Sequence, residues 1–298
     1  MSTISNIILV GATGNLGPSI VNALQSNPKF NITVLSRKGS TSSYSPPHGI
    51  KTITVDYSSH SDLVAAFKGQ DAVVSTVGFP GIVGQIKLID AAIEAGVQRF
   101  IPSEFGSDSG HEKLASMVFH KPKNDVRNYL QEKASEGKIT WSSVSTGPFF
   151  DWGLTSGFIG YNIAEKKATI YDGGSRPFSV TNIADVGAAV AGVLTHPEET
   201  KNRIIRIHSA AVKQLDILAI YERLTGSKWE IEHKDTAELE KAANAKLAQG
   251  DSSTIYHLIY RGVFGEGYGG EFKDVDNKIV GVKLLNEAEI EEVVKSTL

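Results

Sequence analysis

Three glycines stand at intervals of three residues near the N-terminus, in the run Gly11-Ala12-Thr13-Gly14-Asn15-Leu16-Gly17. An apolar run precedes them, and a stretch with helical periodicity follows. In a strand–turn–helix of this kind the first glycine permits a tight turn, the second lets the backbone approach a pyrophosphate, and the third lets helix and strand pack closely. Free N–H groups at the helix start then favour phosphate. The loop therefore predicts a dinucleotide site, the alternative being a glycine turn without a ligand. The residues assigned to it are Gly11, Thr13, Gly14, Asn15, Leu16 and Gly17.

The next apolar run ends in Leu35-Ser36-Arg37-Lys38, which indicates the type of dinucleotide. Proteins that prefer NAD carry an acid about 20 residues after the glycine loop, where it binds the ribose 2′-hydroxyl. No acid stands here. Arg37 offers a fork of donors for a 2′-phosphate, and Lys38 adds a point charge. The sequence predicts NADP(H), bound by Ser36, Arg37 and Lys38; the alternative is an exposed basic pair at a strand end.

A second group of small residues, Ser75-Thr76-Val77-Gly78, ends the fourth apolar run. In a sheet of parallel strands this run ends at the same edge as the glycine loop. We expect Ser75, Thr76, Val77 and Gly78 to lie where the nicotinamide side of the cofactor passes.

Other chemistries lack the residues that they need. The chain has no cysteine, which excludes thiolate catalysis, disulfides and thiolate metal sites. Its eight histidines show no metal-ligand spacing, so we expect no metal. No Gly-x-Ser-x-Gly elbow supports hydrolase chemistry.

Composition narrows the partners. The 298 residues carry a formal net charge of −3 and no long basic block, so we expect neither nucleic acid nor an anionic membrane as partner. The first residues, Met1-Ser2-Thr3-Ile4-Ser5-Asn6, lack a basic region followed by a long apolar run. We therefore expect a soluble, cytoplasmic protein that binds a small molecule and can form a homodimer.

Short apolar runs alternate with helical stretches through the first half of the chain, which indicates βαβ units and a parallel sheet. We predict a doubly wound α/β Rossmann domain over residues 1–150. The predicted strands cover residues 7–10, 32–35, 52–55, 71–77, 99–101 and 139–144. The predicted helices cover residues 15–26, 63–67, 82–95 and 123–135.

The regular alternation stops after Gly147-Pro148. Residues 151–298 are predicted to form a smaller α+β substrate lobe, parts of which can return to the sheet. Strands are expected at residues 168–171, 204–207 and 229–232, helices at 183–194, 215–224, 236–249 and 287–294, and a glycine-rich loop at 262–270.

The glycine loop, Arg37 and the run Arg99-Phe100-Ile101-Pro102-Ser103-Glu104-Phe105-Gly106 together resemble the isoflavone reductase-like and NmrA-like group. This atypical branch of the short-chain dehydrogenases includes phenylcoumaran benzylic ether reductases and pinoresinol reductases. The resemblance covers about the first 150 residues and extends to Val180-Thr181-Asn182-Ile183-Ala184-Asp185-Val186-Gly187. It implies a cofactor contact for Ser103.

The resemblance also implies a catalytic lysine near the start of the helix after the fifth strand, with an arginine four residues later. Lys123 and Arg127 have this spacing, which puts them on one helix face. Lys123 is then the general acid/base, and Arg127 contacts the cofactor. Because Pro122 is tolerated only in a first turn or at a kink, Lys121 remains an alternative.

Tyr129 and Lys133 show the Tyr-x-x-x-Lys spacing of ordinary short-chain dehydrogenases. Tyr129 lies with Val126 and Leu130 on an apolar stripe, which favours core packing over catalysis.

These observations favour an NADPH-dependent reductase of a small aromatic or polyketide-like metabolite. The alternative is an NmrA-like redox sensor that binds NADP without turnover and regulates a protein partner. Four aromatic residues are candidates for the wall of the substrate pocket: Phe105, Phe149, Phe150 and Trp152.

Overall fold

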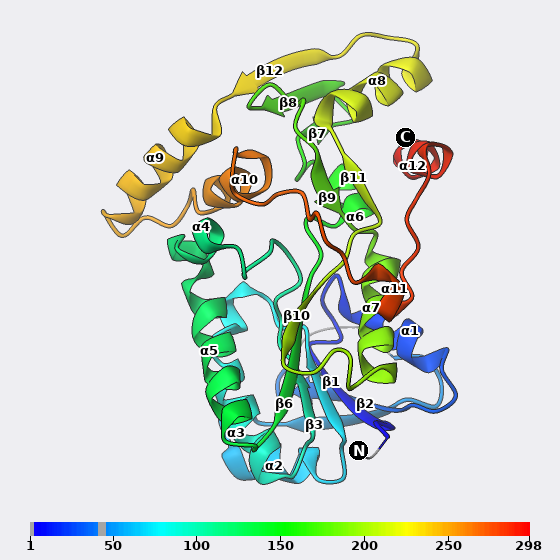
Figure 1. Cartoon of the computed structure of the whole chain (residues 1–298), viewed down its shortest axis with the longest axis vertical. Helices are drawn as coiled ribbons and strands as arrows, with labels where there is room; N and C mark the ends of the chain where they lie inside the picture. The colour runs from blue at the N-terminus through cyan, green and yellow to red at the C-terminus, as the bar shows by residue number, and fades with distance from the viewer. Residues whose placement is uncertain (1–2, 41–45) are drawn as a thin grey trace.

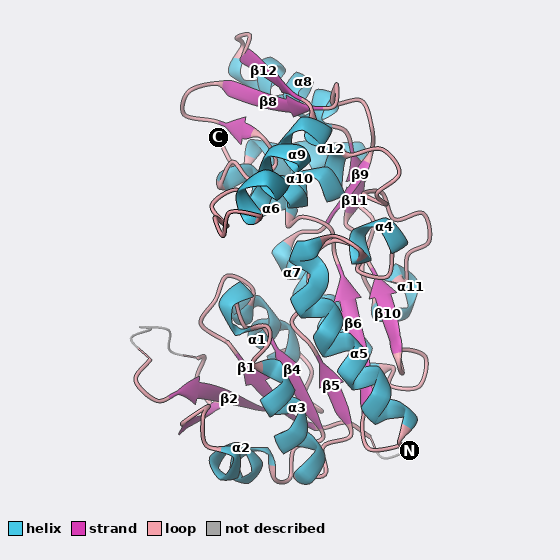
Figure 2. Cartoon of the chain, turned by 90° about the vertical axis from the view of Figure 1, so that its left-hand side faces the viewer, coloured by secondary structure: helices cyan, strands magenta, loops and turns pink. Residues whose placement is uncertain are grey.

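The computed structural model describes residues 3–40 and 46–298. Seven strands form one parallel sheet in the order β10-β6-β5-β4-β1-β2-β3. The seven strands are β1 (Asn6–Val10), β2 (Asn31–Arg37), β3 (Lys51–Val55), β4 (Ala72–Ser75), β5 (Arg99–Ile101), β6 (Thr140–Ser145) and β10 (Arg203–Arg206). This sheet fills the lower half of the molecule in Figure 2. The predicted doubly wound α/β fold is confirmed.

Helices cover both faces of the sheet, as Figure 1 shows. One face carries α1 (Gly17–Gln25), α7 (Ile183–Thr195) and α11 (Asn277–Val280). The other carries α2 (His60–Phe67), α3 (Gln85–Glu94) and α5 (Lys121–Ser135). The central strands β1 and β4 are buried almost throughout, and this is why they read as continuous apolar runs.

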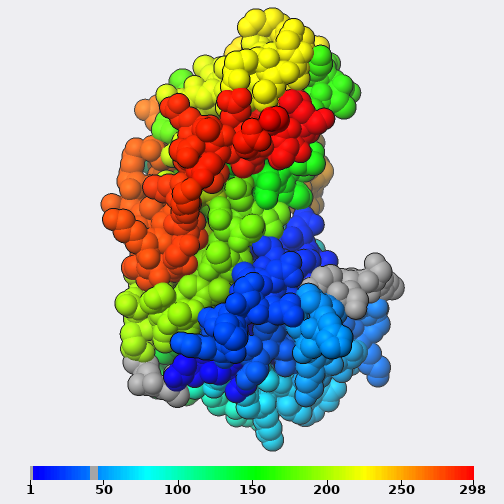
Figure 3. Space-filling view, turned by 90° about the vertical axis from the view of Figure 1, so that its right-hand side faces the viewer, coloured from blue at the N-terminus to red at the C-terminus, as the bar shows by residue number. Residues whose placement is uncertain are grey.

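The C-terminal half of the chain contributes to the lower layer, which is the seven-stranded sheet with its covering helices. It also forms the upper lobe. Strand β10 pairs with β6 in parallel, from Arg203 opposite Ser142 to Arg206 opposite Ser145. A Cβ on Gly192 of α7 would lie 2.2 Å from the Val280 carbonyl oxygen, so the C-terminal chain packs directly on α7. Figure 3 shows the C-terminal chain, in orange, running down from the upper lobe. The N-terminal fold is therefore completed by residues beyond 150.

The upper lobe holds two small sheets and several helices. Strands β9 (Phe178–Val180) and β11 (Ala210–Val212) pair antiparallel, and β8 (Lys167–Tyr171) lies between β7 (Tyr161–Asn162) and β12 (Glu230–Lys234). The helices of this half, apart from α7 and α11, are α6 (Phe150–Thr155), α8 (Gln214–Thr225), α9 (Thr236–Leu247), α10 (Tyr256–Phe264) and α12 (Glu287–Lys295). Helix α10 corrects the first three residues of the loop predicted at residues 262–270, and the other six carry no helix or strand.

No helix among the described residues is both long and apolar enough to cross a bilayer.

Arg99 shows how the edge of the sheet is fixed. Its side chain is 2% exposed, and its guanidinium donates to Thr140, Ser142, Thr200 and the Pro197 carbonyl. Burial lowers its pKa to about 10, opposed by Glu198, so it stays charged at neutral pH. Arg99 thus joins β5 and β6 to the chain between α7 and β10.

We expect Arg99→Met to lower the free energy of unfolding by roughly 2–4 kcal/mol, because it removes charge-assisted hydrogen bonds from a buried site. Urea denaturation measures this. A change below about 0.5 kcal/mol, typical of surface substitutions, would contradict the structural role.

Candidate active site

The carboxyl ends of the parallel strands open onto a cleft of about 570 Å³. It is lined by the glycine loop after β1, by the end of β2, by Tyr57 and Ser58 after β3, and by the chain after β4. Ligands of doubly wound folds bind at this edge. Among the predicted residues, those that line the cleft are Gly11, Thr13, Ser36, Arg37, Val77 and Gly78.

The backbone of the glycine loop is tightly packed at Gly11 and Gly17 and has free space around it at Gly14. Gly11 has φ +87°, and a Cβ there would lie 2.8 Å from the Thr76 carbonyl carbon. A Cβ on Gly17 would lie 2.4 Å from Ala12 backbone atoms, whereas one on Gly14 would meet nothing closer than 3.8 Å. Thr13, Gly14 and Asn15 are exposed, and of these three Thr13 lines the cleft.

Helix α1 begins behind this loop with no side chain capping its N-terminus. Its N-cap residue is Leu16, whose side chain is 7% exposed and packs in the core. Leu16 can therefore offer a ligand only backbone. The uncapped turn and the open backbone at Gly14 fit a pyrophosphate group.

Of the remaining predicted cofactor residues, Ser75, Thr76 and Ser103 support the cleft from behind. The Thr76 hydroxyl donates to the carbonyls of Val10 and Gly11, at 3.0 and 2.9 Å. Ser75 is fully buried, and the Ser103 hydroxyl donates to the Val77 carbonyl at 2.8 Å. Lys38 is exposed beyond the end of β2. These residues brace the walls or extend the rim.

The segment after β5 joins the cleft to a second site. Beyond Ser103, the carbonyl oxygen of Glu104 accepts a hydrogen bond from the Lys123 ammonium. Lys123 lies in the first turn of α5, and Pro122 occupies that turn without a kink. Lys121 instead points to Asp125, its side chain 70% exposed.

Burial lowers the pKa of Lys123; Arg127 adds to this effect and Glu104 opposes it. A lysine whose pKa falls below its usual range releases its proton more readily near neutral pH. The position and the electrostatics of Lys123 therefore suit a proton donor.

Arg127, for which the resemblance implies a cofactor contact, makes its hydrogen bonds to protein groups in this structure. Its side chain is 8% exposed, and its guanidinium donates to Glu104 at 3.1 Å, to the Ser109 carbonyl at 3.0 Å and to Asn124 at 2.9 Å. Its donors are directed at the loop after β5 and at its own helix, so it positions that loop for Lys123.

A pocket of about 210 Å³ lies at Lys123. Phe105, Phe149 and Trp152 line it as expected, together with Phe119 and His120. The expectation for Phe150 is wrong: its side chain is 0% exposed and belongs to the core of the upper lobe. The pocket is apolar apart from a few groups around Lys123.

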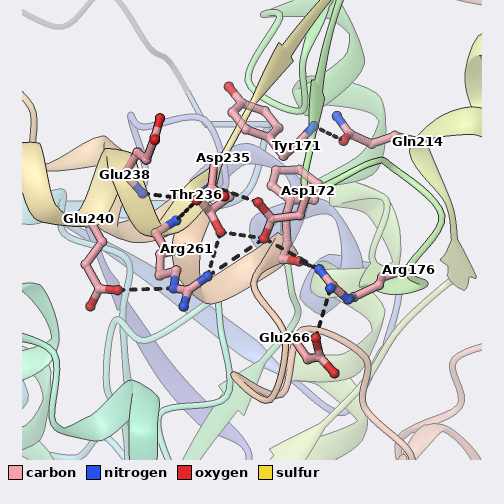
Figure 4. Close-up of polar contacts among 12 residues, drawn as sticks. Tyr171, Asp172, Arg176, Gln214, Asp235, Thr236, Glu238, Glu240, Arg261 and Glu266 are labelled. Carbon is pink, nitrogen blue, oxygen red and sulfur yellow. Dashed lines mark hydrogen bonds and ion pairs between the residues drawn. The ribbon is translucent and has the colours of Figure 1, made fainter.

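Helix α10 closes the pocket with Tyr256, Ile259 and Val263. Sequence reasoning missed these three because it assigned no helix there. Figure 4 shows what holds this helix: Arg261 donates to Glu240 at 3.1 Å and to Thr236 at 2.9 Å. Thr236 in turn donates to Asp172 at the end of β8. The wall of the pocket is thus tied to the upper sheet.

Tyr129 lies away from both sites. Its hydroxyl donates to Asp90 of α3, and this bond raises its pKa to about 12. Lys133 lies over its ring at 5.0 Å. Tyr129 therefore links α5 to α3, and Lys133 packs on its ring. Among the described residues there is also no group of three or more acidic or histidine side chains that could hold a metal ion.

Comparisons with known proteins agree with this architecture. The solved structure of AtPrR2 with NADP+ and (+)pinoresinol matches with a TM-score of 0.81 over 100% of both chains, at 23% identity. The complex of leucoanthocyanidin reductase with NADPH from Vitis vinifera matches with a TM-score of 0.76 over 98% of this chain and 99% of that one, at 19% identity. At these identities the match shows the fold.

Sequence relatives show the family. Oxidoreductase aprR of Aspergillus flavus is 37% identical over 294 residues, 98% of each chain. Oxidoreductase poxI of Penicillium oxalicum is 32% identical over 91% of this chain and 88% of its own length. The model of the NmrA-like family matches residues 3–257. The chain therefore belongs to the NmrA-like family and is an oxidoreductase within it.

Proposed function

We propose that this protein is an NADPH-dependent reductase of small aromatic metabolites and that Lys123 is its general acid. The observation that carries the proposal is the Lys123 ammonium, set in an aromatic pocket and hydrogen-bonded to a loop that also braces the cleft. Two similar structures, named for complexes with NADP+ or NADPH, support the choice of cofactor. Pinoresinol in one of them supports an aromatic substrate.

The division of labour follows from the two sites. When bound, NADPH supplies a hydride from C4 of its nicotinamide ring. The glycine loop and Arg37 hold the dinucleotide, and the aromatic pocket excludes water from the reacting atoms. Lys123 gives its proton to the substrate oxygen that becomes an alcohol or leaves from a cleaved ether, so that hydride and proton complete a two-electron reduction.

The proposal is tested by following NADPH oxidation with enones, quinones and lignan-type benzylic ethers. We expect at least one aromatic class to be reduced with saturation kinetics. If NADPH binds tightly and none of these compounds is reduced, a redox sensor that acts on a protein partner becomes the better account.

We expect Arg37→Ala to weaken NADPH binding about tenfold or more and to leave NADH binding nearly unchanged, because each charge-assisted hydrogen bond contributes about 1.5–3 kcal/mol. Arg37 is exposed and lines the cleft beside Tyr57. Calorimetric titration of both dinucleotides measures the change. Arg37→Lys is the matched variant and should fall between, since it keeps the charge and loses the fork. Equal losses for NADPH and NADH would show that Arg37 does not contact the 2′-phosphate.

A further inference from the structure

His120 is a buried histidine that the proposed chemistry leaves unused. It ends the short 3₁₀ turn Val118–His120 and immediately precedes α5, three residues before Lys123. Only 2% of it is exposed, yet it lines the same pocket as Lys123. Its ring packs on Phe119, with 4.1 Å between ring centroids and 42° between ring planes.

Neither ring nitrogen of His120 has a hydrogen-bond partner among the residues that the structure describes. Buried polar groups in folded proteins are almost always hydrogen-bonded, because an unsatisfied one costs free energy. Such a cost is typical of sites that meet a ligand, where local rules of stability are broken for function. Because His120 also lines the pocket beside Lys123, a ligand seated there would lie against this ring.

The protonation state of His120 defines that partner. Burial lowers its pKa to about 3, and the positive charges of Lys123 and Arg127 act in the same direction. At neutral pH the ring is therefore uncharged, with one nitrogen that donates and one that only accepts. A carboxylate, carbonyl or ether oxygen can accept only from the donating nitrogen, whereas a hydroxyl group can serve either nitrogen. A cationic amine would be repelled by Lys123 and Arg127.

We infer that His120 is a substrate-binding residue that hydrogen-bonds the hydroxyl group of an aromatic substrate seated in the pocket beside Lys123. This rests on the proposed function, since it assigns a phenol-like substrate to the same site. Phe105, Phe149 and Trp152 receive the apolar ring of the substrate. His120 selects for a free hydroxyl group on the aromatic ring. Lys123 remains the proton donor to the other oxygen, which is bonded to the carbon that receives the hydride.

Two probes that differ by one methyl group test this: 2-naphthol, which donates a hydrogen bond, and 2-methoxynaphthalene, which cannot. Both are titrated by calorimetry into the protein with saturating NADP+. We expect 2-naphthol to bind about tenfold more tightly. His120→Phe should weaken 2-naphthol about tenfold and weaken the ether clearly less, because it keeps a ring against Phe119 but removes both nitrogens, of which the ether can use only the donating one. His120→Gln should retain most of the preference, since its amide can still accept and donate.

A stability measurement separates this role from plain core packing. Without ligand, His120→Phe should leave the Tm unchanged or raise it by roughly 2–4 °C, because it removes unsatisfied buried polar atoms. A clearly lowered Tm with an intact 2-naphthol preference would show that the ring packs structurally. Equal binding of the two probes to the unaltered protein, or binding of neither, would also overturn the assignment.

NADPH oxidation by the same proteins distinguishes failure of the reductase function from failure of the His120 assignment. If 2-naphthol is preferred and His120→Phe loses this preference, but NADPH is never oxidised, the proposed reductase function fails and the assignment of His120 stands. If the protein reduces an aromatic substrate but shows no 2-naphthol preference, the assignment of His120 fails alone.

Discussion

Lys123→Met is expected to lower turnover by about 10²–10⁴-fold while changing NADPH affinity little, because it removes the proton donor and keeps much of the side chain's packing. The ammonium is held by the Glu104 carbonyl at the pocket, behind the loop that braces the cleft. Steady-state NADPH oxidation with an aromatic substrate gives kcat, and calorimetry gives the affinity for NADPH. A loss confined to KM would contradict the role as acid, since it would mean that Lys123 only binds substrate.

The pH profile adds an independent readout. A general acid must be protonated, so turnover should fall as the pH rises through the pKa of Lys123. Burial holds that pKa below the usual range of lysine, and the decline should therefore begin at lower pH than an exposed lysine would give. The residual activity of Lys123→Met should lack this decline.

Two neighbouring substitutions serve as controls. Lys121→Met removes an ammonium that is exposed and paired with Asp125, and Tyr129→Phe removes a hydroxyl bonded to Asp90. Neither group lines the pocket, so both variants should keep turnover within a few fold. Collapse of turnover in Tyr129→Phe alone would instead favour the Tyr-Lys mechanism of ordinary short-chain dehydrogenases.

The sequence predicts the lower layer well because its signals are local. A strand buried on both faces is a short apolar run, and the glycines of the 11–17 loop follow directly from a tight turn and close packing. The strand over residues 204–207 is equally local, and β10 forms at residues 203–206. Its pairing with β6 is not local, since it depends on how α7 packs against α1.

The walls of the pocket depend on such non-local packing and were predicted less well. Gly262 suggested a loop, but it lies within α10. Glycine is required there because a Cβ would come 2.5 Å from Leu114 of α4 (Glu112–Ala115). Phe149 and Phe150 are adjacent and alike in the sequence, yet one lines the pocket and the other is core. Which way each ring turns is decided by α6 and the upper lobe. His120 gave no signal, because its environment comes from distant segments.

Gly14→Val is expected to reduce NADPH binding by at least about 100-fold, and thus by more than about 2.7 kcal/mol, without unfolding the protein. The pyrophosphate must approach the backbone at this residue, and a branched side chain would occupy the space between them. Gly14 is exposed, its φ lies outside the left-handed region, and the nearest atom to a Cβ there is the Gly11 carbonyl oxygen at 3.8 Å. The free protein can therefore accept the side chain, and only the ligand would meet it.

Gly17→Ala is the matched contrast, because the same loop is closed at that position. Its Cβ would lie 2.4 Å from the Ala12 backbone, so α1 must move away from β1 and the free energy of unfolding should drop. Denaturation and calorimetric titration of the two variants separate the effects: Gly14→Val should lose binding at nearly unchanged stability, whereas Gly17→Ala should lose stability first. Tight NADPH binding by a folded Gly14→Val protein would mean that the pyrophosphate does not pass over this loop, and the cofactor site would then have to be placed elsewhere along the strand ends.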